Sequence, residues 1–153
     1  MLFRSCLTTD IICGFPGEDD AAFDDTLDVV QRVGFDSAFV FKYSERRNTI
    51  AQRKFRDDVR GQVKTARVVK VNEVQKTISL RRNRALIGRR IEVLIEGRSR
   101  KSADDWMGRD DGGRCVVLPR GDLAAGQLAC VEVVAASANT LMGRCVSPEP
   151  APA

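Results

Sequence analysis

The 153-residue sequence contains no histidine, and it has only one tryptophan and one tyrosine. Without histidine the chain cannot itself supply a Ser-His-Asp triad, a Cys-His pair, a histidine general base or a His-Glu-x-x-His zinc site. No apolar run approaches the roughly 18 residues that a membrane-spanning helix needs, so we expect no membrane partner. The first residues lack the basic and apolar segments of a secretory signal, and we expect a cytoplasmic protein.

The cysteines also lack the spacings of common metal and redox sites. No two of them stand as Cys-x-x-Cys, which argues against a zinc ribbon and a thioredoxin-type motif. An odd number of cysteines without a signal peptide favours reduced thiols, most of them small core residues. The five are Cys6, Cys13, Cys115, Cys130 and Cys145.

Charge is distributed unevenly along the chain, although the total is only +4. Residues 55–103 carry a net +9, whereas residues 1–54 carry −2 and residues 104–153 carry −3. A basic segment between two acidic ones is typical of a surface that binds a polyanion. A solvated helix face explains an isolated run of charges equally well, so charge alone does not decide between them.

The first third of the chain is typical of one βαβ unit. We expect a strand over 7–14, a turn over 15–18, a helix that ends at Gly34 and a second strand over 35–43. Phe23, Leu27 and Val30 follow the i, i+4, i+7 spacing of a single apolar helix stripe. The two strands should be parallel, with a right-handed crossover.

Such a unit leaves a sheet edge and one sheet face uncovered. We therefore expect residues 1–54 to be a piece of a larger α/β domain, unless a dimer or a second chain supplies the missing strands. Phe39 and Phe41 alternate with Ala38 and Val40 along the second strand, and we expect both phenylalanines to be core residues.

Residues 55–86 predict one long basic helix that links two domains. Its apolar seam is thin, and arginine and lysine fill the other faces. The seam consists of Val59, Val63, Ala66, Val71, Val74 and Ile78.

From Arg89 onward the apolar period changes from that of a helix to that of strands. Five short strands punctuated by glycines predict a small barrel of the oligonucleotide-binding type over residues 87–147. Residues 148–153 are rich in proline, and we expect a disordered tail. The predicted fold class is thus α/β plus all-β.

Three stretches carry motifs that resemble one enzyme family. Residues 9–18, Thr-Asp-Ile-Ile-Cys-Gly-Phe-Pro-Gly-Glu, and residues 34–44 resemble the end of the catalytic domain of radical S-adenosylmethionine methylthiotransferases. Residues 79–146 resemble the TRAM domain that follows it. The resemblance is strongest to the members that methylthiolate N6-isopentenyladenosine next to the anticodon of tRNA.

The resemblance implies a fragment of a partial (β/α) barrel and a border of the S-adenosylmethionine site. Glycines at the end of a strand allow a sharp turn and a close approach of ligand to backbone. An ordinary tight strand-to-helix connection is the alternative for the turn. The implied cofactor-binding residues are Ile12, Gly14, Phe15, Pro16, Gly17, Glu18, Phe41 and Tyr43.

For the TRAM region the resemblance implies tRNA binding. Clustered cations suit phosphate contacts, and we expect them near the entry of the barrel. Trp106 either stacks a base or plugs the barrel, and the sequence favours neither. The implied RNA-binding residues are Arg81, Arg82, Arg84, Arg89, Arg90, Arg98, Arg100, Lys101, Trp106 and Arg109.

The sequence departs from the family in two places. Family members bind [4Fe–4S] clusters through closely spaced cysteines, which are absent here. Residues 45–49, Glu-Arg-Arg-Asn-Thr, replace a Pro-Arg-Pro-Gly-Thr type of stretch. We therefore expect the C-terminal portion of a methylthiotransferase that is inactive alone. The alternatives are a stand-alone RNA-binding TRAM protein and a relative acting on threonylcarbamoyladenosine or a ribosomal protein.

Overall fold

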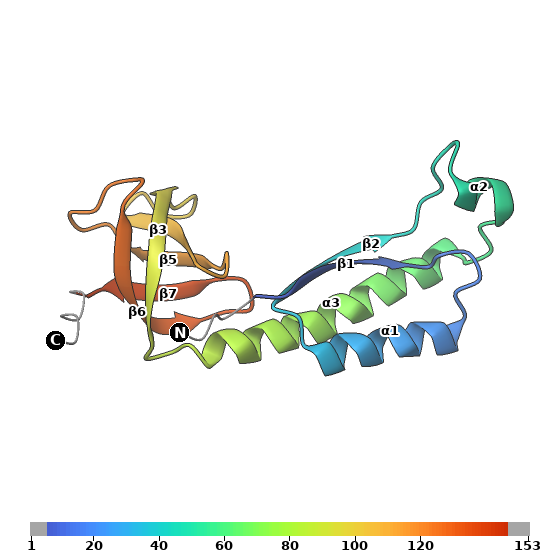
Figure 1. Ribbon diagram of the computed structural model, residues 1–153, viewed down its shortest axis with the longest axis horizontal. Helices are drawn as coiled ribbons and strands as arrows, with labels where there is room; N and C mark the ends of the chain where they lie inside the picture. Colours follow the sequence, from blue (N-terminus) through green and yellow to red (C-terminus); the bar gives the residue numbers. More distant parts are fainter. Residues whose placement is uncertain (1–5, 147–153) are drawn as a thin grey trace. The chain divides into compact units, whose positions relative to one another are not determined.

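A computed structural model describes residues 6–146 of the chain (Figure 1). The chain divides into two compact units. Residues 7–79 form the first, which we call the α/β unit. The second, the barrel unit, runs from Leu80 onward and also includes Cys6. The boundary lies within the long helix α3 (Gly61–Arg84). The tail expected over 148–153 lies outside the described residues.

The α/β unit begins with the βαβ arrangement expected from the sequence. Strand β1 (Thr8–Cys13), helix α1 (Asp20–Val33) and strand β2 (Ser37–Lys42) follow one another, and the two strands pair in parallel. The side chain of Asp19 caps α1 by accepting a hydrogen bond from the Ala22 N–H at 2.8 Å. Gly34 ends the helix in the left-handed conformation, with φ 64°.

Helices α1 and α3 cover one face of the two-stranded sheet (Figure 1). Their shared core is buried behind the strands, and the predicted stripe of α1 contributes to it. The core consists of Cys13, Val30, Val71 and Ile78, with Ile11, Phe23, Leu27, Phe35, Val40, Val68 and Val74 packed against it.

The long helix begins later than expected, at Gly61 instead of residue 55. A short helix, α2 (Ile50–Lys54), precedes it and was not predicted. The chain between them is irregular, and both of its carboxylates have partners. Asp57 accepts a hydrogen bond from Lys64 Nζ at 2.6 Å, and Asp58 accepts one from the Gly17 N–H at 2.9 Å.

The prediction of which α3 residues are buried is confirmed for the second half of the helix and is wrong for the first half. Val71 and Ile78 are buried, but Val63 is exposed. Two cations take the buried positions one and two turns before Val71: Lys64 is 3% exposed and Arg67 is 6% exposed. They are buried because carboxylates of the α/β unit pair with them.

The second face of the β1–β2 sheet is open, and this corrects the expectation for two phenylalanines. Phe39 is 66% exposed and Phe41 is 52% exposed, so neither is a core residue. Strand alternation points both away from the helices, whereas Val40 packs against them. Nothing within the described part of the chain covers the face that they share with Ile12.

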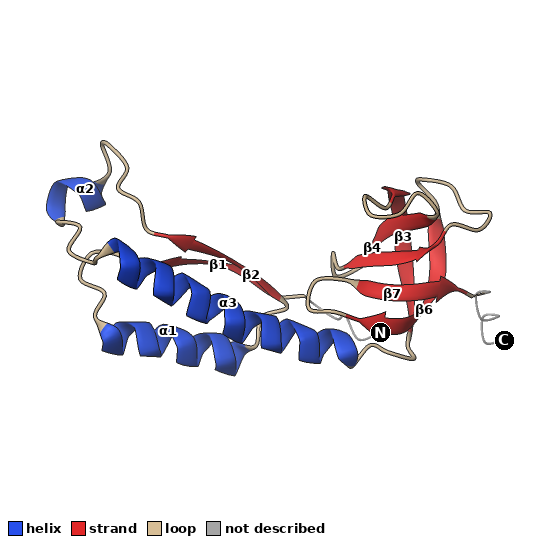
Figure 2. Ribbon diagram, turned by 180° about the vertical axis from the view of Figure 1, so that it is seen from behind, coloured by secondary structure: helices blue, strands red, loops and turns tan. Residues whose placement is uncertain are grey.

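The barrel unit contains five strands that close into a barrel, as predicted (Figure 2). The order around the barrel is β3-β4-β5-β7-β6, and all neighbours are antiparallel except β5 and β7. The strands are β3 (Arg90–Arg98), β4 (Asp105–Asp110), β5 (Cys115–Pro119), β6 (Leu128–Ala136) and β7 (Leu141–Cys145).

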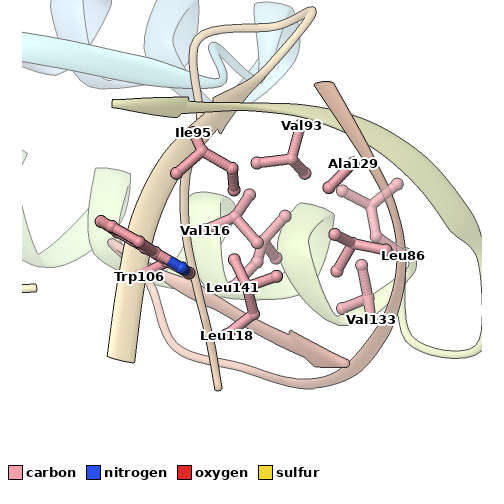
Figure 3. Packing of buried hydrophobic residues seen from close by; sticks show 10 residues of the cluster. Leu86, Val93, Ile95, Trp106, Val116, Leu118, Ala129, Val133 and Leu141 are labelled. Carbon is pink, nitrogen blue, oxygen red and sulfur yellow. The ribbon is translucent and has the colours of Figure 1, made fainter. Parts of the chain in front are cut away.

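Alternate residues of the five strands fill the barrel interior (Figure 3). Val93, Val116, Val131, Val133 and Leu141 are completely buried there. Gly143 allows β6 and β7 to approach closely, because a Cβ at this position would lie 2.9 Å from the Glu132 carbonyl oxygen.

The end of α3 belongs to the barrel unit. Leu86, just beyond the helix, lies in the barrel core. The side-chain amide of Asn83 donates hydrogen bonds to the carbonyl oxygens of Ser137 and Ala138, at 2.9 and 3.1 Å, in the β6–β7 connection. None of the helices within residues 6–146 is long and apolar enough to cross a membrane.

Candidate functional site

The turn between β1 and α1 is held in one conformation by its own residues. The Glu18 carboxylate accepts a hydrogen bond from the Gly14 N–H at 2.9 Å, and the Glu18 N–H donates to the Phe15 carbonyl oxygen at 2.9 Å. Gly14 and Gly17 have φ values of 77° and 81°, which disfavour a side chain. Gly14 also lies against Lys64, whose side chain a Cβ would overlap.

Arg67 of α3 connects this turn to the start of α1. Its guanidinium donates to the Glu18 carbonyl oxygen and carboxylate, both at 2.8 Å, and to the Asp20 carboxylate at 2.7 Å. Burial of the guanidinium by itself lowers the pKa of Arg67. The hydrogen bonds and negative charges of Asp20 and Glu18 outweigh burial, so the pKa lies above its ordinary value. The cation is therefore permanent, and it fixes Glu18 in place.

Aromatic contacts fix the other side of the turn. The Phe15 ring meets the Tyr43 ring edge to face, with centroids 5.1 Å apart, and Lys64 Nζ lies 4.9 Å from the centre of the Tyr43 ring. The Phe55 ring also contacts the Phe15 ring, with centroids 6.3 Å apart. The turn therefore presents a rigid rim at the carboxyl ends of β1 and β2.

A hollow of about 480 Å³ opens beside this rim. Four of the eight predicted cofactor-binding residues line it: Ile12, Phe15, Phe41 and Tyr43. Ile12 and Phe41 are direct partners across the two strands. The hollow is lined as well by Asp10, Lys42, Ser44, Arg46, Thr49 and Ala51.

The other four predicted residues do not line the hollow. Gly14 and Gly17 shape the turn, Pro16 lies within it, and Glu18 is occupied by Arg67 and the Gly14 N–H. The hollow combines apolar and aromatic walls with one carboxylate, from Asp10, and two cations, from Lys42 and Arg46, which suits a small amphipathic ligand. Among residues 6–146, no cluster of three or more cysteine, aspartate or glutamate side chains could hold a metal ion.

Cys13 lies under the turn, and its thiol is shielded from solvent. Burial is the main cause that raises its pKa above the ordinary value of 9.0, and the nearby Glu18 carboxylate adds to it. Because the folded state favours the neutral thiol, the α/β unit should lose stability as pH rises above that value.

We therefore expect iodoacetamide to modify the exposed Cys145 at least about 100-fold faster than Cys13 at pH 8, since the thiolate must form and be reached. Mass spectrometry of peptides from a timed reaction measures both rates, and urea should remove the difference. Equal rates in the native protein would contradict the buried position of Cys13.

The cations predicted to bind RNA do not form one patch. Arg81, Arg82, Arg84, Arg89 and Arg90 lie at the end of α3 and the start of β3, and we call them the helix-end cluster. Arg98, Arg100 and Lys101 lie at the far end of β3, about 26 Å away along the strand. With Arg120, these three form the loop-end cluster.

The two clusters are exposed, but the remaining predicted residues are not equally available. Arg109 donates to the Glu96 carboxylate at 3.1 Å and to the Gly113 carbonyl oxygen at 2.9 Å. Trp106 is 7% exposed and packs in the barrel core (Figure 3). Of the two roles left open by the sequence, the structure supports the plug, since its ring is buried where a base would have to stack.

Sequence reasoning missed Arg120, Lys64 and Arg67. The Arg120 guanidinium lies 5.3 Å from the centre of the Trp106 ring, and the Arg120 N–H donates to the Asp104 carbonyl oxygen at 3.0 Å, which places it beside the β3–β4 loop. For Lys64 and Arg67 a signal existed: they precede Val71 by seven and four residues, so they continue its helical face.

Comparison with known proteins agrees with the barrel geometry. Residues 84–146 match the model of the TRAM domain family. The barrel is a TRAM domain. The match begins at Arg84, the last residue of α3.

The chain is also similar to curated proteins named tRNA-2-methylthio-N(6)-dimethylallyladenosine synthase. It is 42% identical to that of Azobacteroides pseudotrichonymphae over 137 residues, and 44% identical to that of Chlorobium limicola over 138 residues. These matches cover 90% of this chain but 30% and 31% of the two relatives. The chain is therefore similar to the C-terminal portion of these synthases, and it spans about a third of their length.

Proposed function

We propose that this chain binds tRNA through the outer surface of its TRAM barrel. The observation that carries the proposal is the separation of cations from acids at the helix-end cluster. No acidic residue stands between Glu73 and Glu92, whereas this stretch contains Lys76 and the five arginines of the cluster. Phosphates of RNA are the partner that such a surface attracts.

The side chains that would make these contacts are available. Within residues 6–146, Arg81, Arg84 and Arg89 form no ion pair, and all three are exposed. Cations near the C-terminus of a helix are also stabilised by the helix dipole. This effect accounts for the arginines in the last turn of α3, but it does not account for Arg89, which lies beyond the helix. A tRNA-bound protein would act in the cytoplasm, as the sequence led us to expect.

A titration of tRNA against the chain at increasing salt tests this proposal. We expect the logarithm of the binding constant to fall linearly with the logarithm of salt concentration, with a slope of about −3 to −5 if several phosphates are contacted. Filter binding with labelled tRNA measures the slope. Negligible affinity even at low salt would refute the proposal.

The wider activity proposed is that of the family, methylthiolation of N6-isopentenyladenosine in tRNA. The hollow beside the Gly14–Glu18 turn would accept one side of S-adenosylmethionine, with Ile12, Phe41 and Tyr43 against the apolar parts of the ligand. When bound, S-adenosylmethionine and a [4Fe–4S] cluster would supply the radical chemistry. The described residues fit the first ligand and not the cluster, so we expect the chain alone to be inactive.

We also propose that a second chain supplies further strands that extend the β1–β2 sheet at its edges, so that the open face lines the interior of a (β/α) barrel. Ile12, Phe39 and Phe41 form an exposed apolar surface there, and two strands do not make a stable sheet alone. Co-expression with the N-terminal two thirds of the Chlorobium limicola relative tests this. Co-purification with loss of dye binding to the apolar face would support it, and failure of the two to associate would refute it.

A further inference from the structure

We infer that the barrel recognises the phosphate backbone of a base-paired RNA stem and does not bind unpaired bases by stacking. This inference rests on the proposed tRNA binding and names the part of the RNA that is recognised. It follows from the aromatic residues of the barrel unit, the position of Trp106 and the chemistry of the exposed side chains.

The barrel unit has almost no aromatic residues with which to hold a base. Of the nine aromatic residues in the sequence, Trp106 is the only one beyond Phe55. Small barrels that bind single-stranded nucleic acid combine a basic groove with several aromatic side chains, on which successive bases stack. This barrel has the basic surface without a series of stacking residues.

The one aromatic residue among the described residues of the barrel unit also lies in the interior. Trp106 is 7% exposed, and it faces Leu118 on β5 and Arg98 on β3 in the strand register. Its indole N–H is buried and has no hydrogen-bond partner. Packing against the barrel core, and not a hydrogen bond, therefore holds the ring in its position. The Arg120 guanidinium lies over the ring at 5.3 Å. A base could reach the indole only if Arg120 moved away and the barrel opened.

What the surface does offer is guanidinium groups. Arg81, Arg84 and Arg89 at one end and Arg98, Arg100 and Arg120 at the other are exposed. Arginine suits phosphate because its planar fork can donate two parallel hydrogen bonds. Double-stranded RNA is recognised mainly through its phosphates, 2′-hydroxyls and shape, because its major groove is too narrow for side chains. A rigid stem also holds its phosphates in fixed positions, so a fixed set of arginines can contact several at once.

Arginine can also stack on an unpaired base, and a direct comparison separates the two modes. The full chain is titrated with an RNA hairpin and with a single strand of the same length and base composition that cannot pair. We expect the hairpin to bind at least about tenfold more tightly, with little effect of stem sequence. Equal or tighter binding of the single strand would overturn the inference and leave tRNA binding intact. Failure of both RNAs to bind would also overturn the inference, and the tRNA titration then decides separately whether the proposed function stands.

Trp106 provides a second readout, since it is the only tryptophan. We expect its fluorescence to change little when the hairpin binds, and Trp106→Leu to alter affinity by less than about threefold, whereas loss of a stacking tryptophan costs roughly 10- to 100-fold. Strong quenching on binding would overturn the inference, and this measurement on the unchanged protein stands even if the variant fails to fold.

Arg120 is the new residue assigned to the RNA surface. Arg120→Gln should reduce the salt slope of hairpin binding by about 1. The matched control is Arg144→Gln, because Arg144 is exposed but pairs with the Glu132 carboxylate at 3.1 Å. An Arg120 variant that binds hairpin with unchanged affinity and slope would exclude this residue from the surface.

Discussion

Replacement of Arg67 by methionine is expected to destabilise the α/β unit by about 3–5 kcal/mol, the cost of removing one partner from a buried ion pair. Methionine retains the apolar volume but none of the three hydrogen bonds to Glu18 and Asp20. The Glu18 carboxylate, which is largely buried, would lose its charged partner. The Gly14–Glu18 turn would then lose its link to α3.

Two reporters separate this effect from a general loss of stability. Alkylation of Cys13 in urea reports unfolding of the α/β unit, whereas Trp106 fluorescence reports the barrel. We expect the Cys13 transition to move to a much lower urea concentration and the Trp106 transition to move less. The matched control is Arg32→Met, because the exposed Arg32–Asp28 pair contributes less than about 1 kcal/mol.

A double variant tests the stated cause. If the uncompensated carboxylate is responsible, Arg67→Met combined with Glu18→Gln should recover part of the lost stability, since the buried charge is gone. No recovery would mean that the packing of Arg67 against the Phe23 ring, 5.2 Å from the guanidinium carbon, matters more than its charge.

Reversal of charge at the helix-end cluster is expected to weaken tRNA binding by at least about 100-fold at low salt, because each lost phosphate contact also becomes a repulsion. The variant is Arg81→Glu, Arg84→Glu and Arg89→Glu, three exposed side chains without ion pairs within residues 6–146. Filter binding at several salt concentrations should show a slope reduced by about 3.

The control for this variant changes the net charge equally on the α/β unit, through Arg32→Glu, Arg47→Glu and Arg53→Glu. We expect it to weaken binding much less, because screening limits distant charges. Trp106 fluorescence in urea verifies that the barrel remains folded. If both variants lose affinity equally, net charge and not the helix-end cluster governs binding.

The loop-end cluster should contribute less than the helix-end cluster. Reversal of Arg98, Arg100 and Lys101 should weaken binding without unfolding the barrel. Asp104 in the β3–β4 loop and Asp105 at the start of β4 partly offset these cations. A larger loss here than at the helix end would place the main RNA contact at the other end of β3.

Periodicity and the turn residues in the sequence were enough to predict every strand and helix α1, but they missed the short helix α2 and placed the start of α3 too early. The alternation of Ile91, Val93 and Ile95 predicts a strand from local sequence alone, because successive side chains of a strand point to opposite faces, one buried and one exposed. Asp19 and Gly34 mark the ends of α1 for equally local reasons. The resemblance carried by residues 9–18, 34–44 and 79–146 implied the family and the candidate site residues.

Only the tertiary structure decided which side chains are buried and which are free. A basic residue on a helix suggests a face that is exposed to solvent, yet Lys64 and Arg67 are buried. Asp57, in the segment before α3, pairs with Lys64. Glu18 and Asp20, which are distant in the sequence, pair with Arg67. Phe41 suggests a core residue, yet it is exposed because no further element covers its face of the sheet. The burial of a side chain depends on contacts with residues that are far away in the sequence. The local sequence pattern around that side chain contains no information about these residues.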